Sequence, residues 1–155
     1  MGLIAVIACG VSTAACAGRT AQPQPEGTSP TNAASAKQKV IDTVSAVTER
    51  LGGVWTTRSG PGYTQICQLP NGESGAHWVN LVANAEGGDP EPDAAATTAL
   101  WKSQGMTVER WADPDGPGIV GRRRDSVESI SLYASPRNYT VQAVSLCFRG
   151  DADRL

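Results

Sequence analysis

Apolar residues recur at helical spacing between Ser35 and Gly52. They fall on one stripe of a helical projection while the charged residues between them fall elsewhere, which predicts an amphipathic helix. Gly52 and Gly53 follow the last apolar position and end the helix, because glycine readily adopts the backbone conformation that closes a helix. The stripe consists of Val40, Ile41, Val44, Val47 and Leu51.

A second helix is predicted for residues 90–104. Asp89 has the position of the N-cap, Pro90 that of the first helical residue, and Gly105 follows the helix end. We expect this helix to have a modest buried face, formed by Ala96, Ala99, Leu100 and Ser103.

Short runs of β-forming residues alternate with turns rich in Gly and Pro. The last two runs are joined by residues 135–138 and predict a hairpin. Two helices packed on a mostly antiparallel sheet of about six to seven short strands indicate an α+β fold, in a single domain over residues 35–150. The polar residues 151–155 are expected to fray. Strands are expected at residues 54–57, 63–69, 77–84, 106–111, 119–124, 127–134 and 139–148.

The first 15 residues carry no charge and consist of small and apolar side chains. A permanent membrane span needs about 20 apolar residues, so this segment fits the apolar part of a secretory signal peptide. Thr13-Ala14-Ala15-Cys16 resembles a bacterial lipobox. Cleavage there would make Cys16 the new N-terminus, carrying a thioether-linked diacylglycerol. The alternative for this segment is an N-terminal core helix.

Cys9 is a second candidate for lipidation, because Val6-Ile7-Ala8-Cys9 also fits the tetrapeptide. Cleavage before Cys9 would leave almost no apolar stretch in front of it, and Cys16 would remain as an odd thiol. We therefore favour Cys16. Residues 16–34 contain three Pro and no large apolar side chain, which indicates a flexible tether between the lipid and the domain.

Cleavage before Cys16 leaves Cys67 and Cys147 in the mature chain. Exported proteins usually pair such cysteines, and both residues fall in predicted strands. We expect a structural disulfide between them. The alternative is a reactive or metal-binding thiol, but no C-x-x-C spacing or neighbouring His supports it.

Composition limits the remaining possibilities. The chain has 155 residues, of which 40% are hydrophobic and 18% charged, and its net charge is -2. This balance excludes nucleic-acid binding by bulk phosphate neutralisation. A single His excludes a multi-histidine metal site. No metal or cofactor is expected.

Few residues suggest catalysis. His77 is the sole imidazole, and we interpret it as structural, with a general base as the alternative. Asp113-Pro114-Asp115-Gly116 resembles the opening of a calcium loop but lacks the later ligands and the closing Glu. An ordinary turn is the favoured interpretation.

Arg122, Arg123 and Arg124 form the only dense run of charge. Arginine forks suit phosphate and carboxylate groups, so this run is a candidate site for an anionic lipid headgroup or an acidic glycan. The favoured alternative is a solvated edge strand that charge protects from aggregation. Asp125 and Glu128 are close enough in sequence to neutralise part of it.

Four tryptophans make up half of the aromatic residues. We expect them to form a bulky core in a domain with a single Phe, and we expect burial of Trp78 above all. The alternative is a pocket in which they stack on a sugar or a lipid chain. They are Trp55, Trp78, Trp101 and Trp111.

The layout resembles the small LppA-type lipoproteins of mycobacteria and related actinobacteria. The resemblance rests on the lipobox, the Pro-rich tether, the helix and strand of residues 40–55, Cys67, and the final strand around Ser145-Leu146-Cys147-Phe148. It implies an envelope lipoprotein and carries over no catalytic residue.

These observations predict a non-enzymatic lipoprotein at the outer leaflet of the cytoplasmic membrane. Its domain would be a monomer that binds an envelope lipid, glycan or protein. One alternative is an envelope enzyme, or an enzyme accessory, that uses Glu109, Asp113 and Asp115, because carboxylate catalysis requires two such groups across a cleft. Another is an unlipidated secreted protein.

Overall fold

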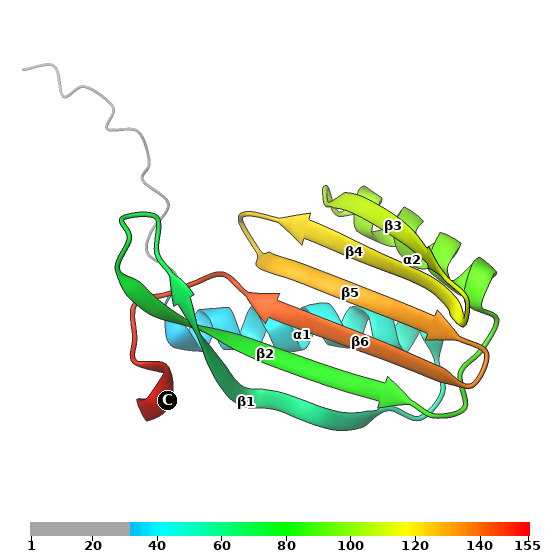
Figure 1. The fold of residues 1–155 in the computed structure, drawn as a ribbon, viewed down its shortest axis with the longest axis horizontal. Coiled ribbons are helices and arrows are strands. Elements are labelled where there is room, and N and C mark those ends of the chain that lie inside the picture. Colours follow the sequence, from blue (N-terminus) through cyan, green and yellow to red (C-terminus); the bar gives the residue numbers. More distant parts are fainter. Residues whose placement is uncertain (1–31) are drawn as a thin grey trace, which may run out of the picture.

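The structure is a computed structural model that describes residues 32–155. Two helices and a six-stranded antiparallel sheet form two layers (Figure 1). The predicted α+β fold is therefore confirmed, with six strands. The elements are α1 (Ala33–Leu51), β1 (Thr56–Gln68), β2 (Ser74–Asn84), α2 (Pro90–Ser103), β3 (Thr107–Asp113), β4 (Gly116–Arg123), β5 (Val127–Ser135), β6 (Asn138–Ser145) and a final 3-10 turn, η1 (Ala152–Arg154).

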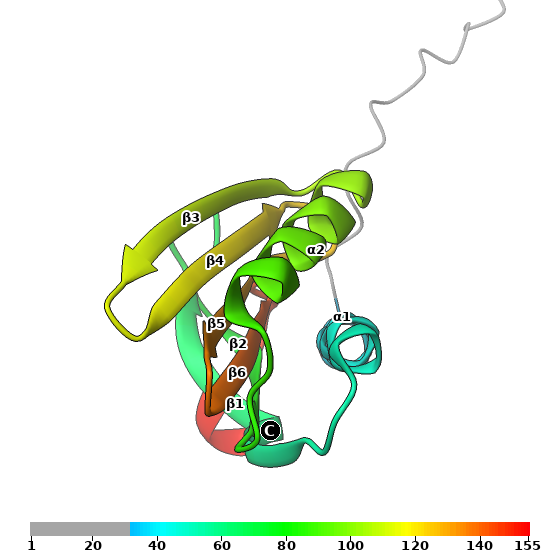
Figure 2. The ribbon, with the colours of Figure 1, turned by 90° about the vertical axis from the view of Figure 1, so that its right-hand side faces the viewer.

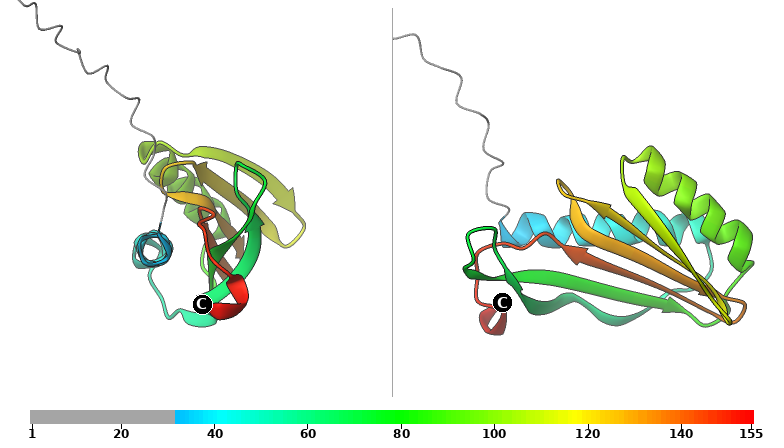
Figure 3. Two further views of the ribbon diagram at one scale, coloured as in Figure 1. Left: turned by 90° about the vertical axis from the view of Figure 1, so that its left-hand side faces the viewer. Right: turned by 45° about the horizontal axis from the view of Figure 1, so that its top comes forward.

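The strand order in the sheet is β1-β2-β6-β5-β4-β3. Helix α2 carries the chain from β2 to the opposite edge, and β3 to β6 then return as a meander that ends beside β2. Both helices lie on the same face of the sheet (Figures 2 and 3). The turns after β3 and β5 lie at one end of the sheet, together with the start of α2 (Figure 1).

The core lies between the helices and the sheet. Helix α1 contributes Val40, Val44 and Val47 from its predicted stripe, and α2 contributes Trp101, which is fully buried. Alternate residues of the strands face these helices, as the period of two requires. The buried sheet residues include Ala76, Trp78, Ile119, Ile130, Leu132, Tyr139, Val141 and Ala143.

The predicted break between strands at residues 58–62 is wrong. β1 runs continuously from Thr56 to Gln68, with register shifts against β2 on either side of Ser59. Gly60 has a φ of 85°, and a Cβ there would overlap the backbone of Val79 and Asn80. The glycine bends the strand closely against β2 instead of ending it, so the sheet has one strand fewer than the seven runs suggested.

The predicted buried face of α2 is wrong in part: Leu100 packs against the core and Ala96 is half-buried, but neither is fully buried. The residues that the sheet covers are Ala94, Thr97 and Trp101, whereas Ala99 and Ser103 are exposed. The spacing of three and four residues is helical in both sets. The indole of Trp101 has far more apolar area to bury than any alanine, and this decides which side of the helix faces the sheet.

The ends of the domain differ from the prediction by a few residues. Helix α1 begins at Ala33, inside the expected tether, because the side chain of Asn32 accepts a hydrogen bond from the Ser35 N–H at 2.8 Å. The C-terminal residues, expected to fray, instead form η1, which Asp151 caps. Thr64 of β1 donates a hydrogen bond to the Ala152 carbonyl at 2.7 Å and ties this turn to the sheet.

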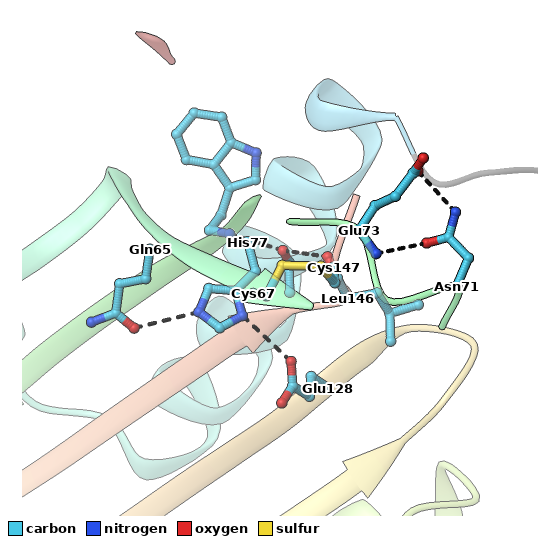
Figure 4. The surroundings of a disulfide bond; sticks show 10 residues. Gln65, Cys67, Asn71, Glu73, His77, Glu128, Leu146 and Cys147 are labelled. Carbon is cyan, nitrogen blue, oxygen red and sulfur yellow. Dashed lines mark hydrogen bonds and ion pairs between the residues drawn. A yellow bond between two sulfur atoms is a disulfide. The ribbon is translucent and has the colours of Figure 1, made fainter. Parts of the chain in front are cut away.

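Cys67 and Cys147 form the predicted disulfide, with Cα atoms 5.9 Å apart (Figure 4). Cys67 lies in β1 and Cys147 lies after the end of β6, so the bond links two segments that flank β2. It crosses β2 at Gly75, the register partner of Cys67. A Cβ on Gly75 would lie 2.9 Å from the Cys147 sulfur and 2.5 Å from the Phe148 carbonyl oxygen. The missing side chain is what allows this crossing.

Neither helix among residues 32–155 combines the length and apolarity of a membrane span. The predicted signal peptide of residues 1–15, the candidates Cys9 and Cys16, and the tether up to residue 31 lie outside the described residues.

Replacing both cysteines, as Cys67→Ala with Cys147→Ala, tests the contribution of the disulfide. The bond closes a loop across a sequence separation of 80 residues. Chain entropy then predicts a loss of about 4–5 kcal/mol in the free energy of unfolding, measured by guanidinium titration. Cys16→Ser is the control and should leave this energy unchanged. A loss below about 1 kcal/mol would contradict a stabilising role.

Tyr139 is expected to make the free energy of unfolding decrease at alkaline pH. Its side chain is 1% exposed, and its hydroxyl donates a hydrogen bond to the Asp93 carboxylate at 2.7 Å. Burial, and then this hydrogen bond, raise the pKa of Tyr139 well above its usual range. The unfolded chain releases the proton near pH 10 while the folded chain retains it, so the free energy of unfolding falls as the pH rises above about 10.

We expect Tyr139→Phe to reduce this alkaline slope and to cost about 1–3 kcal/mol near neutral pH through the lost hydrogen bond. Guanidinium titrations between pH 8 and 11 measure both effects. Tyr63→Phe, which removes an exposed hydroxyl, serves as the matched control. An identical slope in Tyr139→Phe and in the unmodified chain would refute the assignment.

Candidate binding site

The face of the sheet opposite the helices carries a row of side chains from four neighbouring strands. The register joins Trp111 to Gly118, Gly118 to Tyr133, and Tyr133 to Thr140. Partners in an antiparallel register share a face. The neighbouring row contains the fully buried Ile119, Leu132 and Val141, so the row of Trp111 points away from the helices. We call this side the open face.

Trp111 and Tyr133 form an aromatic pair on the open face. The indole of Trp111 lies directly over Gly118, where any Cβ would overlap it. Tyr133 follows on the other side of Gly118, about 10 Å from Trp111 at the usual strand spacing. Trp111 remains 43% exposed. Because Gly118 has no side chain, one face of the Trp111 indole packs flat against the strand, and the other face of the indole is open to solvent.

A pocket of about 550 Å³ lies beside Tyr133, between the turn after β3 and the turn after β5. Such a volume lies within the range of small-molecule sites in proteins. The pocket is mostly polar, with a carboxylate, a guanidinium, an amide and two hydroxyl groups around it. The lining residues that supply them are Asp115, Arg137, Asn138, Tyr133 and Ser135.

Asp113 organises this end of the sheet. Its Oδ1 atom accepts hydrogen bonds from the Tyr133 hydroxyl and the Asp115 N–H, each at 3.1 Å. Desolvation, and then the hydrogen bond to Asp113, raise the pKa of Tyr133 above its usual range. The hydrogen bond from this hydroxyl to Asp113 holds the aromatic ring beside the turn.

A second hollow, of about 350 Å³, lies on the other side of the turn after β3. Asp113 and Asp115 line it together with Asp89 and Glu91 from the start of α2. Arg110 forms an ion pair with Glu91 there. Carboxylates outnumber guanidinium groups around this turn, so its local charge is negative.

The structure brings together two of the three predicted carboxylates. Asp113 and Asp115 lie in one turn, whereas Glu109 lies four residues earlier in β3, about 13 Å away along the strand. Glu109 forms an ion pair with Arg122 at 3.3 Å. Within residues 32–155, no group of three or more His, Cys, Asp or Glu side chains is arranged to hold a metal ion.

The predicted edge position of the arginine run is wrong. β4 lies between β3 and β5 inside the sheet. Arg122 pairs with Glu109, and Arg123 pairs with Asp125 at 2.5 Å and donates to the Gln104 carbonyl. The hydrogen bond from Arg123 lowers the pKa of Asp125. Arg124 is exposed after the end of β4, so the three guanidinium groups do not converge on one ligand.

The four tryptophans have different environments. Trp78 is 6% exposed, which confirms its expected burial, and Trp101 is fully buried, so both belong to the core. Trp78 stacks against Phe148 with ring centroids 6.0 Å apart. Trp55 is half-buried beside the core, and Trp111 lies on the open face.

His77 lies on β2 beside the disulfide, between Gln65 and Glu128 (Figure 4). Its Nε2 atom is 3.4 Å from the Gln65 amide oxygen, and its Nδ1 atom is 3.4 Å from the Glu128 carboxylate. The side chain is 13% exposed. Glu128, expected to neutralise the arginine run, faces the histidine instead. Neither pocket described above includes His77.

Sequence reasoning missed Tyr133, Arg137 and Asn138 as site residues. The predicted hairpin around residues 135–138 does form. The available signal was the alternation in this segment, which places Tyr133 on the same face as Ser131 and Ser135. The sequence does not reveal that β5 pairs with β4, and this pairing brings Tyr133 next to Gly118 and Trp111.

Gly118→Ala tests whether the Trp111 indole packs against the backbone of Gly118. The new methyl group would displace Trp111, so we expect stronger acrylamide quenching of tryptophan fluorescence and a stability loss of about 1 kcal/mol. Gly62→Ala is the control, because a Cβ there meets only Lys37 Nζ, at 3.9 Å. Unchanged quenching in Gly118→Ala would show that the indole does not lie over Gly118.

Comparisons with known proteins give a structural likeness. No family model matches the chain, and no curated protein sequence matches it. A crystal structure of a DUF4853 family protein from Actinomyces odontolyticus is similar, with a TM-score of 0.51 and 15% sequence identity. The match covers 75% of this chain and 65% of that chain, less than two thirds of its length. At this identity the likeness extends to the fold alone.

Proposed function

We propose that this protein is an exported lipoprotein, anchored through Cys16 to the outer leaflet of the cytoplasmic membrane, whose domain is a non-enzymatic binding module. The observation that carries the proposal is the disulfide between Cys67 and Cys147. Disulfides persist mainly in compartments outside the reducing cytosol, so the bond supports export.

The disulfide also supports the choice of lipidation site. With Cys67 and Cys147 paired, Cys9 and Cys16 are the remaining cysteines. Cleavage before Cys16 removes Cys9 and leaves no unpaired thiol, because Cys16 carries the lipid. Cleavage before Cys9 would leave Cys16 as a free thiol in an oxidising compartment. The resemblance to LppA-type lipoproteins points the same way.

The pocket beside Tyr133 supports a binding role. It collects donors and acceptors beside one aromatic residue, Tyr133, and its lining contains neither a histidine nor a cysteine. The sole histidine, His77, lies outside this pocket, near the start of β2 and between Gln65 and Glu128. The arrangement suits recognition of a polar ligand rather than nucleophilic catalysis.

One observation favours a second candidate, an enzyme or enzyme accessory that uses carboxylates. Asp113 and Asp115 line the same hollow at the turn after β3. Turnover of an envelope glycan or lipid that is lost in Asp113→Asn would establish that function. Absence of turnover would leave the binding role, whereas turnover unaffected by this substitution would place an enzymatic activity at other residues.

The intact mass of the protein from the membrane fraction of an actinobacterial host tests the proposal. We expect a chain that begins at Cys16, carries an added diacylglycerol, and gains two hydrogens on reduction. Cys16→Ser should abolish the lipid and the membrane association, whereas Cys9→Ser, the matched control, should retain both. An unlipidated chain would refute the anchor and indicate a secreted protein.

A further inference from the structure

We infer that the open face at Trp111 and the adjacent pocket bind an uncharged glycan. This inference rests on the proposed role as a binding module and names the chemical class of its ligand. Three properties of the site carry it: a flat aromatic surface open to solvent, a mixture of donors and acceptors beside that surface, and a local charge that disfavours anions.

The aromatic surface suits a sugar ring. Pyranose and furanose rings present C–H groups on one face, and these pack against the flat surface of an indole or phenol. Trp111 is 43% exposed although its other side is covered by Gly118. Tyr133, half-buried, lies across Gly118 and continues the aromatic surface toward the pocket. A ring stacked on Trp111 would therefore place its neighbour at the pocket.

The polar groups of the pocket match sugar hydroxyls. A hydroxyl both donates and accepts hydrogen bonds, so its ideal site offers both kinds of partner. Arg137 supplies donors only, Asp115 acceptors only, and Asn138 supplies both. Pairs of such groups fit the neighbouring hydroxyls of one sugar, whereas an alkyl chain in the same place would leave them unsatisfied.

Charge distinguishes neutral glycans from other polar ligands. Asp113 and Asp115 lie in the turn between the two hollows, with Asp89 and Glu91 behind them. These carboxylates repel phosphate, sulfate and uronate groups. Within the pocket itself Arg137 lies in the same lining as Asp115, so a cation also meets a like charge there. An uncharged ligand avoids both penalties.

The test is a titration of the detergent-solubilised full chain with four neutral oligosaccharides: maltohexaose, cellohexaose, mannohexaose and arabinohexaose. Hexagalacturonate serves as the anionic comparator. The readout is the ¹H–¹⁵N indole signal of Trp111, assigned from its absence in Trp111→Ala, together with the Kd. We expect at least one neutral oligosaccharide to bind, to shift this signal, and to bind more tightly than hexagalacturonate.

Two variants localise the binding. Trp111→Ala should weaken it at least tenfold, and Asn138→Ala should weaken it several-fold from a different element. Tyr63→Ala is the matched control, because Tyr63 is 47% exposed and lies on β1, at the opposite edge of the sheet. It should bind as the unmodified chain does. Thermal unfolding of each variant verifies that it is folded.

The inference is overturned if none of the four neutral oligosaccharides binds, if hexagalacturonate binds more tightly, or if Trp111→Ala and Asn138→Ala bind as well as Tyr63→Ala. These outcomes are distinguishable from failure of the proposed lipoprotein. The lipid anchor is read from the mass of the chain, and it can be present in a protein that binds no glycan.

Discussion

Burial of one face of the sheet under two helices is the constraint on which the rest of the structure depends. The helices make few contacts with each other and both pack on the sheet. The inward residues of the strands therefore supply most of the apolar core. Side chains alternate between the two faces along a strand. Once one residue faces the helices, the residues before and after it in the strand must therefore face away from them. Ile119 and Leu132 in the core therefore determine that Gly118 and Tyr133 face outward.

Glycines in the strands permit the close contacts that ordinary side chains would block. Gly75 lets the disulfide cross β2, and Gly60 lets β1 bend closely against β2. Gly118 lets the indole of Trp111 pack directly against the backbone of β4. In each case the strand continues, although glycine inside a strand usually weakens it. The disulfide adds stability at β1, an edge strand whose only neighbour in the sheet is β2.

The proposed site follows from the same arrangement. The turns after β3 and β5 meet at one end of the sheet, where Asp113 holds Tyr133 through its hydroxyl. A domain linked to a membrane through its N-terminal segment would present this face to its surroundings as a rigid surface. Because the stacking residues sit on paired strands and the polar groups on short turns, the site needs little ordering when it binds a ligand.

The sequence by itself determined the fold class, the position of α1, the hairpin of β5 and β6, and the pairing of Cys67 with Cys147. These depend on local periodicity, turn residues and the number of cysteines. Only the tertiary structure decided that β1 is continuous and that α2 faces the sheet with the side that carries Trp101. It also decided that Trp111 lies across Gly118 from Tyr133. The reason is physical: strand pairing joins residues distant in the chain, and no local pattern encodes which strands become neighbours.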